Sequence, residues 1–396
     1  MATATQDTSR KAAVRFIVAL GLISLFGDVT YEGARSVIGP FLGTLGASAF
    51  AVAFIAGFGE MVGYALRLVS GYAADKTRSY WLLVTFGYTL NLLAVPLLAL
   101  AGNWWLAAIL IVLERTGKAI RTPARDVMLS QAAKQVGRGW GFGLHEAMDQ
   151  TGALLGPLVV AAVLAESHEY WRAFAVLAIP ACLAIATLLT ARSLYPNPIA
   201  FEKKSTGLAT EGLSRTFWIY VIAAGLLAAG FVDFPLISYH FRADRLTTQT
   251  MIPILYAISN GIEGLAALVF GKLFDKIGIS ALIIGALLSS ASSPLVFLGG
   301  FAMAVAGMIL WGAGMGAQQA LLRAAIANIV PSERRGAAYG IFNTVYGLLW
   351  FAGSAAMGAL YGVSRPGLVA FAMAAQLCAV PLLWWVSRPK ATQART

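Results

Sequence analysis

The sequence predicts an all-α membrane protein in which twelve transmembrane helices form two pseudo-symmetric bundles of six, with both termini in the cytoplasm. Three observations support this fold class: an apolar composition, a series of apolar runs of membrane-spanning length, and a repeat that relates the two halves. Of the 396 residues, 59% are hydrophobic and only 12% are charged. A water-soluble fold of ordinary composition cannot bury that much apolar surface, so lipid is the expected solvent for most of the chain.

Each apolar run is about 20 residues long, which is the length that spans the hydrocarbon core of a bilayer. The first run follows a polar segment and precedes no small-residue cleavage site, so we expect a retained helix and not a removed signal peptide. Short connections force neighbouring helices to be antiparallel, and each half then becomes a compact bundle. In chain order, the runs are centred near residues 27, 59, 90, 117, 151, 181, 229, 261, 289, 316, 349 and 376.

A repeat at an offset of about 200 residues relates the two halves. The segment Gly71–Lys76 reads Gly-Tyr-Ala-Ala-Asp-Lys, and Gly271–Lys276 reads Gly-Lys-Leu-Phe-Asp-Lys. Each segment follows a long apolar run, and such an internal duplication is the ground plan of many membrane carriers. A hydrophilic stretch separates six runs from six. We therefore predict an N-terminal bundle over residues 1–192, a cytoplasmic linker over 193–214 and a C-terminal bundle over 215–396.

The net charge of +11 does not indicate a nucleic-acid partner, because Lys and Arg of membrane proteins gather in cytoplasmic loops. Most basic residues between the predicted spans fall on one side, which includes both termini, so we assign that side to the cytoplasm. Only two cysteines are present, and both lie inside apolar runs, so neither a disulfide framework nor a cysteine metal site is expected. The opposite side carries little positive charge beyond Arg172, Arg242, Arg245 and Arg365.

Ionisable residues inside the spans are the candidate functional residues, because each costs several kcal/mol unless it is paired or faces water. The first half carries most of them, and we expect at least one of its mid-depth carboxylates to titrate during transport. The second half is mostly neutral at the matching positions. The predicted cavity residues are Asp28, Glu32, Arg35, Glu60, Glu114, Arg115, His145, Glu146 and Asp149 in the first half, and Asp233, Tyr256, Asn260, Glu263 and Gln319 opposite them.

Structural interpretations remain open for several of these residues. Glu32 and Arg35 can neutralise each other within one helix. His145 can serve as a hydrogen-bond donor without carrying a proton through the cycle. Arg121 and Arg125 fall near the cytoplasmic end of the fourth span, where long side chains can reach the surface or pair with acidic loop residues. For this arginine pair we expect a structural or gating role.

Proton coupling would follow from the neighbourhood of carboxylates and arginines. A low-dielectric cavity favours the protonated form of a carboxyl group, and a nearby guanidinium favours the ionised form. If substrate or a conformational change moves Arg35 or Arg115, a carboxyl group can exchange its proton. Alternating access then requires only that the two protonation states favour opposite openings of the cleft.

Over essentially its whole length, the chain resembles the major facilitator superfamily, whose fold has the two bundles predicted above. The segment Gly71–Arg78 looks like the family's loop motif between helices 2 and 3, although Arg78 replaces its last glycine, which the second copy keeps as Gly278. The resemblance assigns Arg115 to a cavity arginine implicated in proton transfer. It also implies gating or latch roles for the motif residues Gly71, Asp75 and Lys76, the second-half Asp275, and the helix 5 residues Gly152, Gly156 and Pro157.

The helix 5 motif, Gly152-Ala-Leu-Leu-Gly156-Pro157, is similar to that of antiporter-type exporters, and the region also looks like a bacterial subgroup that includes nickel and drug exporters. We therefore predict a secondary transporter of a prokaryotic plasma membrane that exports a small molecule in exchange for protons. No Walker-type loop is present, and we expect no enzyme activity, no cofactor and a monomer. Divalent metal efflux, transport of an anionic or zwitterionic solute or of a lipid, and a sensor or scaffold without transport are the alternatives.

Overall fold

The computed structural model describes residues 2–196, 213–331 and 334–388. The described residues fold into helices without a strand, which agrees with the predicted all-α class. Most of the predicted linker, residues 197–212, lies outside the described residues.

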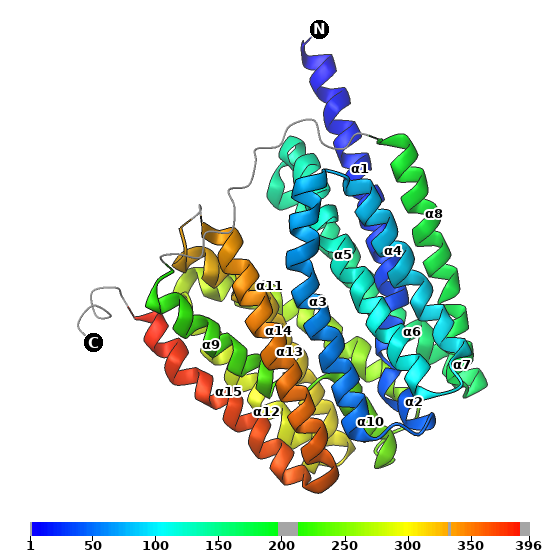
Figure 1. The fold of residues 1–396 in the computed structure, drawn as a ribbon, viewed down its shortest axis with the longest axis vertical. Coiled ribbons are helices and arrows are strands. Elements are labelled where there is room, and N and C mark those ends of the chain that lie inside the picture. The colour runs from blue at the N-terminus through cyan, green and yellow to red at the C-terminus, as the bar shows by residue number, and fades with distance from the viewer. Residues whose placement is uncertain (1, 197–212, 332–333, 389–396) are drawn as a thin grey trace. The chain divides into compact units, whose positions relative to one another are not determined.

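Figure 1 shows the helices in chain order. The helices of the first half are α1 (Ala2–Arg35), α2 (Ile38–Thr44), α3 (Ala49–Thr77), α4 (Tyr80–Leu97), the 3-10 helix η1 (Leu98–Leu100), α5 (Trp104–Val136), α6 (Arg138–Ser167), α7 (Tyr170–Val176) and α8 (Ala178–Leu194). Those of the second half are α9 (Arg215–Gly230), α10 (Phe234–Ala243), α11 (Met251–Ile277), α12 (Ser280–Leu298), α13 (Phe301–Ile329), α14 (Arg335–Val363) and α15 (Arg365–Ser387).

Within the described residues, eleven helical segments are long and apolar enough to cross a membrane. Of the twelve predicted spans, the one that is not among these eleven is α5. It has 33 residues, which is ample length, but its middle carries a run of charged side chains. The charged side chains of such a helix need partners inside the protein, and these partners are expected among the residues packed around it. Twelve spans and cytoplasmic termini stay predictions.

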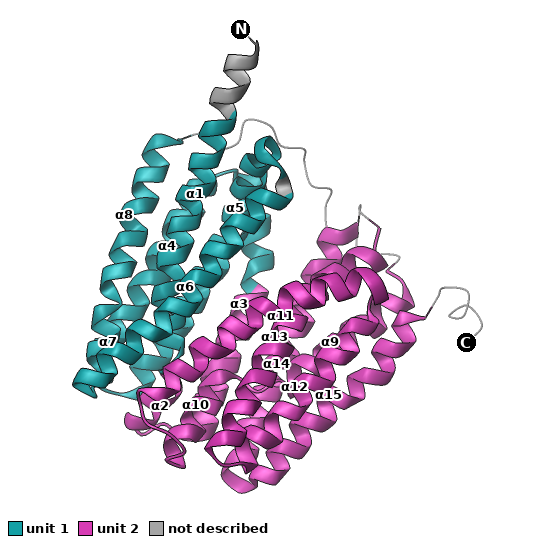
Figure 2. Cartoon of the chain, turned by 180° about the vertical axis from the view of Figure 1, so that it is seen from behind, with its two compact units in different colours: residues 1–37, 66–205 teal, residues 38–65, 206–396 magenta. Residues whose placement is uncertain are grey.

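The chain forms two compact units, coloured separately in Figure 2: unit 1 contains residues 1–37 and 66–205, and unit 2 contains residues 38–65 and 206–396. Within unit 2, small residues of the segment 38–65 pack closely on the second half. A Cβ atom on Gly57 would lie 2.6 Å from the Ser354 Cβ, and one on Gly358 would lie 2.6 Å from the Ala53 Cβ. The predicted boundary in the linker stays a prediction, and the packing adds that 38–65 associates with the second half.

The core of unit 1 lies between α1, α4, α5 and α8 and includes Ile17, Leu20 and Tyr88. Two glycines bring the backbones of α4 and α5 close together. A Cβ atom on Gly87 would lie 2.7 Å from the Arg121 amide nitrogen, and one on Gly117 would lie 2.5 Å from the Asn91 amide nitrogen. Larger residues would therefore hold these helices apart. This close approach carries Arg121 into the interior of the unit.

In unit 2, the predicted span near residue 229 is broken between α9 and α10, at Phe231–Asp233. A helix break inside a membrane span is tolerated only where the protein satisfies the freed backbone groups. Here Trp311 Nε1 donates to the Val232 carbonyl at 2.8 Å, and Gln376 Nε2 donates to the Gly230 carbonyl at 2.9 Å. Side chains of the surrounding helices thus stabilise the break.

The loop motif that ends α3 keeps its turn despite the missing glycine. Arg78 has φ 53°, in the left-handed region, and its amide donates to the Ala74 carbonyl at 2.9 Å. Gly278 ends α11 with φ 59°, and its amide donates to Phe274 at 2.8 Å. Both residues follow the last turn of a helix, where glycine is favoured because it lacks a Cβ atom. Arg78 adopts a positive φ as Gly278 does, at a conformational cost.

Candidate functional site

A buried polar network in unit 1 is centred on Ser24 of α1, a residue with no solvent exposure. Its Oγ lies 3.1 Å from the Tyr88 hydroxyl of α4 and 3.2 Å from His145 Nε2 of α6, and it accepts a hydrogen bond from Arg125 Nη1 of α5 at 3.0 Å. A serine hydroxyl donates once and accepts twice. With Arg125 donating to it, the three contacts are satisfied if one of Tyr88 and His145 donates and the other accepts. Four helices therefore meet at one hydroxyl whose bonding depends on the tautomer of a histidine.

Asp149 is a carboxylate of this network that is held only by loose contacts. Its Oδ2 lies 3.8 Å from Arg125 Nη1 and 3.6 Å from His145 Nδ1, one turn earlier on α6. Both distances exceed that of a normal hydrogen bond. Its Oδ1 is buried and has no hydrogen-bond partner among the residues that the structure describes. Arg125 in turn makes closer contacts with the neighbouring Asp126, at 2.9 and 3.1 Å.

Arg121 is the most deeply buried cation of the network, with 1% of its surface exposed. Its guanidinium lies 4.0 Å above the centre of the Tyr88 ring, and Nη2 lies 4.0 Å from Asp28 Oδ1. Within the described part of the chain, its Nε and Nη1 have no hydrogen-bond partner. A buried cation held by one distant carboxylate and one aromatic face is costly. Such an arrangement favours a functional over a purely structural role.

A second cluster of unit 1 surrounds Tyr31 of α1 with three cations. Arg35 Nη1 donates to the Tyr31 hydroxyl at 2.9 Å, and Arg115 donates a short hydrogen bond to the same oxygen. Lys118 Nζ lies 3.6 Å from the centre of the Tyr31 ring. Glu114 contacts Arg115 at 3.4 Å and accepts a hydrogen bond from the Asn91 side chain at 2.6 Å. Positive charge of α1 and α5 therefore converges on one phenol ring.

The structure brings part of the predicted cavity set of the first half together. Asp28, His145 and Asp149 join the Ser24 network, together with both arginines for which we predict a gating role. Arg35, Glu114 and Arg115 join the Tyr31 cluster, and Glu32 is half-buried on the same helix. Glu146 lies outside both groups: its side chain is exposed and accepts a hydrogen bond from Gln150 at 3.2 Å.

Among the predicted gating residues, Asp75 and Lys76 are exposed at the end of α3, and Asp275 is exposed near the end of α11. A Cβ atom on Gly71 would lie 3.8 Å from the Pro123 side chain. The two motif glycines of the fifth predicted span, which is α6, pack on α1. A Cβ atom on Gly152 would lie 3.1 Å from the Asp28 Cβ, and one on Gly156, which precedes Pro157, would lie 2.8 Å from the Gly33 amide nitrogen. The gating roles themselves stay predictions.

In unit 2, Asp233 is the buried carboxylate of the predicted set. It lies at the break between α9 and α10, where its Oδ2 accepts hydrogen bonds from Trp350 Nε1 at 2.9 Å and from Ser354 Oγ at 2.7 Å. Tyr256 stacks on the Phe234 ring, with 4.2 Å between ring centres. The remaining members of the set are Glu263, which accepts a hydrogen bond from Gln319 at 2.6 Å, the buried Asn260, and Glu60, half-buried on the part of α3 that belongs to unit 2.

The sequence prediction does not include Ser24, Tyr31 and Tyr88, because its members in the first half are all acidic residues, arginines or histidine. A pattern that identifies two of them is nevertheless present: Ser24, Asp28, Tyr31 and Arg35 follow one another at spacings of four, three and four, which puts them on one face of α1. Tyr88 is identified as a member of the network only from the close packing of α4 and α5 in the structure. Within the described residues, no three of the His, Cys, Asp and Glu side chains form a group that could hold a metal ion.

Comparison with known sequences identifies relatives along the whole chain. The sequence model of the Major Facilitator Superfamily matches residues 19–354 and, in a second match, residues 216–396. A protein of Mycobacterium tuberculosis is 38% identical over 386 residues, which cover 96% of this chain and 94% of that protein. An MFS-type transporter of Methanocaldococcus jannaschii is 27% identical and covers 87% of this chain and 88% of its own length. A benzoate transport protein of Acinetobacter baylyi is 32% identical over 36% of this chain and 30% of its own length.

Solved structures share the fold at low sequence identity. The nucleoside transporter NupG aligns with a TM-score of 0.73 at 16% identity, over 94% of this chain and 98% of that structure. The peptide transporter POT in complex with sulfate aligns with a TM-score of 0.74 at 14% identity, over 94% of this chain and 93% of that structure. At these identities the likeness concerns the fold alone.

Proposed function

Because the chain belongs to the Major Facilitator Superfamily, it is a multi-pass membrane transporter, and we propose that it exports a small solute in exchange for protons. The observation that carries this proposal is the loosely held Asp149 carboxylate. Its charge faces Arg125 and His145 at 3.8 and 3.6 Å, and its second oxygen has no hydrogen-bond partner among the described residues. A carboxylate held this loosely can accept a proton without first breaking a strong ion pair.

Arg125 is the group through which a proton on Asp149 would act on the helices. The guanidinium bonds Ser24 of α1 and Asp126 of α5 and faces Asp149 of α6. When Asp149 is ionised, its charge attracts Arg125 toward α6. When Asp149 is protonated, that attraction is lost and the two shorter contacts hold Arg125 toward α1 and α5. The two protonation states therefore favour different arrangements of these three helices.

One exchanged proton supplies enough energy to bias such a transporter. If one opening binds one proton more than the other, each pH unit shifts the free energy between them by about 1.4 kcal/mol, which is a tenfold change in their ratio. We propose export as the direction of transport because Gly152–Pro157 resembles the exporter motif. The relatives come from Mycobacterium tuberculosis and Methanocaldococcus jannaschii, which favours the plasma membrane of a prokaryote as the location.

The substrate class favoured by a specific observation is an anionic or zwitterionic solute. Three cations, Arg35, Arg115 and Lys118, converge on the Tyr31 ring and its hydroxyl. Guanidinium groups match the planar geometry of a carboxylate, and a nearby aromatic ring suits an aromatic or apolar body. The name of the partial relative, a benzoate transport protein, agrees with such a substrate.

The test of proton coupling uses liposomes that contain the purified protein, an imposed pH gradient and an internal pH dye. A panel of organic acids, antibiotics and metal salts, benzoate among them, identifies solutes that discharge the gradient with the wild type. With such a solute, Asp149→Asn should slow the discharge at least about tenfold, because the amide cannot exchange a proton. Glu166→Gln changes an exposed carboxylate near the end of the same helix and should leave the rate unchanged.

Equal rates for Asp149→Asn and the wild type would overturn the assignment of the coupling carboxyl group. The substrate class is tested in the same liposomes by substituting Lys118→Gln. This change should raise the half-saturation concentration for an organic anion but not that for a cationic solute, because the charge of Lys118 attracts an anion and repels a cation. An equal effect on both kinds of solute would contradict the assignment of the Tyr31 cluster to an anion.

A further inference from the structure

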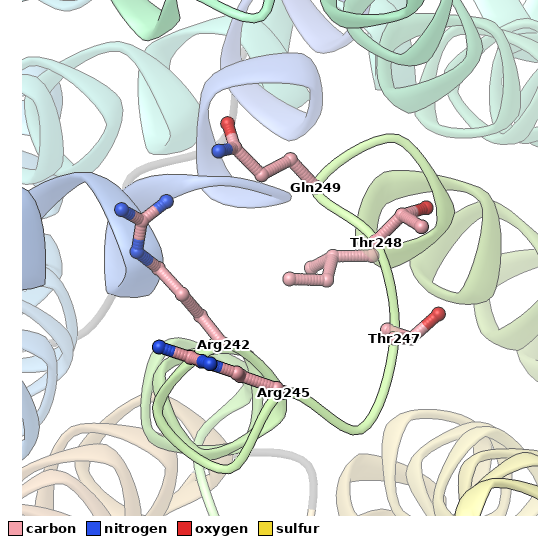
Figure 3. Close-up of a pocket in the computed structure, with 6 residues that line it drawn as sticks. Arg242, Arg245, Thr247, Thr248 and Gln249 are labelled. Carbon is pink, nitrogen blue, oxygen red and sulfur yellow. The ribbon is translucent and has the colours of Figure 1, made fainter.

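A cavity of about 280 Å³ lies in unit 2, where α10 ends and α11 begins. Figure 3 shows the Arg242 and Arg245 side chains extending from the end of α10 and the Gln249 side chain extending from the connecting loop, whereas the oxygens of Thr247 and Thr248 point away from the two arginines. None of these residues belongs to the Ser24 network or the Tyr31 cluster. The cavity is lined by Arg242, Arg245, Thr247, Thr248, Gln249 and Ile252.

Arg245 occupies a backbone position that glycine would fill at lower cost. The Leu246 amide donates to the Phe241 carbonyl at 3.0 Å, and the Arg245 amide donates to the Arg242 carbonyl at 3.1 Å. These two bonds form a Schellman motif at the end of α10, in which the residue at the position of Arg245 is usually glycine. Arg245 has φ 53°, which an L side chain adopts only with strain. Strain of this kind often marks a residue that is kept for its side chain.

The charge of Arg245 is not balanced by the carboxylate next to it. Both oxygens of Asp244 accept hydrogen bonds from Arg365, one of them at 2.6 Å. Asp244 also faces His240, with 3.8 Å between Oδ2 and Nδ1. Within the described residues, the Arg245 guanidinium makes no ion pair, and its side chain is exposed. The cavity therefore has an uncompensated cation at its wall.

The first turn of α11 adds further positive potential. Thr248 caps this helix: its carbonyl accepts from the Met251 amide at 3.1 Å, and its Oγ1 accepts from the same amide at 3.3 Å. The helix has 27 residues, so its macrodipole brings a partial positive charge to the cavity. The side-chain amide of Gln249 also lines the cavity, and its nitrogen is a possible donor.

We propose that this cavity binds a phosphate-type oxyanion, carried either by a free solute or by a lipid headgroup. Two guanidinium groups reach it from the end of α10, and the N-terminal end of α11 adds a partial positive charge. Guanidinium groups form charge-assisted, often paired hydrogen bonds with phosphate oxygens, so two of them at one cavity suit a phosphate-type group. The volume of about 280 Å³ accommodates one such group with its first waters.

The test measures inorganic phosphate binding by isothermal titration calorimetry, with the full chain in a phosphorus-free detergent. Arg245→Gly relieves the positive φ, so this variant should fold at least as well as the wild type, and should weaken phosphate binding at least about tenfold. Arg242→Gln should weaken binding similarly. The matched control is Arg323→Gln, which removes an exposed arginine elsewhere in unit 2 and should leave binding unchanged.

Native mass spectrometry of the protein from phosphatidylglycerol nanodiscs distinguishes the two sources of the anion. Retained phosphatidylglycerol that is lost in Arg245→Gly identifies a lipid headgroup, and phosphate binding in calorimetry without lipid retention identifies a free solute. The proposal is overturned if the wild type neither binds phosphate nor retains the lipid. It is also overturned if Arg245→Gly binds phosphate as tightly as the wild type, or if Arg323→Gln weakens phosphate binding at least about tenfold.

Discussion

Gly156 of α6 provides the sharpest test of how unit 1 is held together. A Cβ atom at this position would lie 2.8 Å from the Gly33 amide nitrogen and closer still to the Val29 carbonyl oxygen, both on the backbone of α1. Backbone atoms cannot rotate away as a flexible side chain can. Gly156→Ala therefore has to move one helix relative to the other.

The size of the effect follows from these distances. Ordinary van der Waals contact begins at 3.4 Å, so the helices have to separate by about 0.6 Å to clear the nitrogen and by more to clear the oxygen. Overpacking of this kind costs about 1–3 kcal/mol. Because α1 and α6 carry Ser24, His145 and Asp149, the same displacement should also lengthen the contacts of the Ser24 network. We expect Gly156→Ala to lower both stability and transport.

The assay is thermal unfolding in a mild detergent, with Gly143→Ala as the matched control. Gly143 lies on the same helix, and a Cβ atom there would meet nothing within 4 Å among the described residues. Gly143→Ala should therefore stabilise the protein by about 0.5–1 kcal/mol, through the higher helix propensity of alanine. A melting temperature of Gly156→Ala at or above that of the wild type would refute the close packing of α1 on α6.

Three further outcomes are expected. Arg78→Gly should stabilise the protein by about 1 kcal/mol in thermal unfolding, because glycine adopts φ 53° without strain; a loss of stability would mean that the arginine side chain outweighs its backbone cost. Trp350→Phe should destabilise it by about 1.5–3 kcal/mol, because it removes a hydrogen bond to the buried Asp233, and an unchanged melting temperature would contradict that bond. Glu146→Gln should preserve the discharge of a pH gradient in liposomes, since its exposed carboxylate bonds only Gln150 among the contacts of the described residues; loss of coupling there, and not at Asp149, would move the proton site by one turn of α6.

The all-helical membrane class and the importance of Asp28, His145 and Asp149 of the Ser24 network could be predicted from local patterns. Apolar runs of membrane-spanning length identify helices, and charges inside such runs identify residues that need partners. The spacing of His145 and Asp149 places both on one face of a helix, and the structure confirms that they face each other. The break between α9 and α10 is not predicted, although Gly230, Asp233 and Pro235 disfavour a continuous helix there.

The remaining features depend on packing between distant segments. Arg121 and Arg125 look like residues of a cytoplasmic helix end, but glycines at 87 and 117 let α4 and α5 approach so closely that both arginines reach the unit interior. No periodicity in a single sequence reports which two glycines meet. Glu60 belongs to the first half of the sequence, yet its part of α3 packs within unit 2. The partner of a long helix is likewise not encoded in its own pattern.

We propose that a proton on Asp149 biases the equilibrium between the two openings. The chain has two cysteines, Cys182 of unit 1 and Cys378 of unit 2, and both are exposed, so spin labels can be attached without substitution. Pulsed electron paramagnetic resonance then gives the distribution of distances between the units at mildly acidic and mildly alkaline pH. If Asp149 is the coupling carboxyl group, the distribution should shift with pH in the wild type and stay constant in Asp149→Asn. A shift of the same size in both proteins would contradict it.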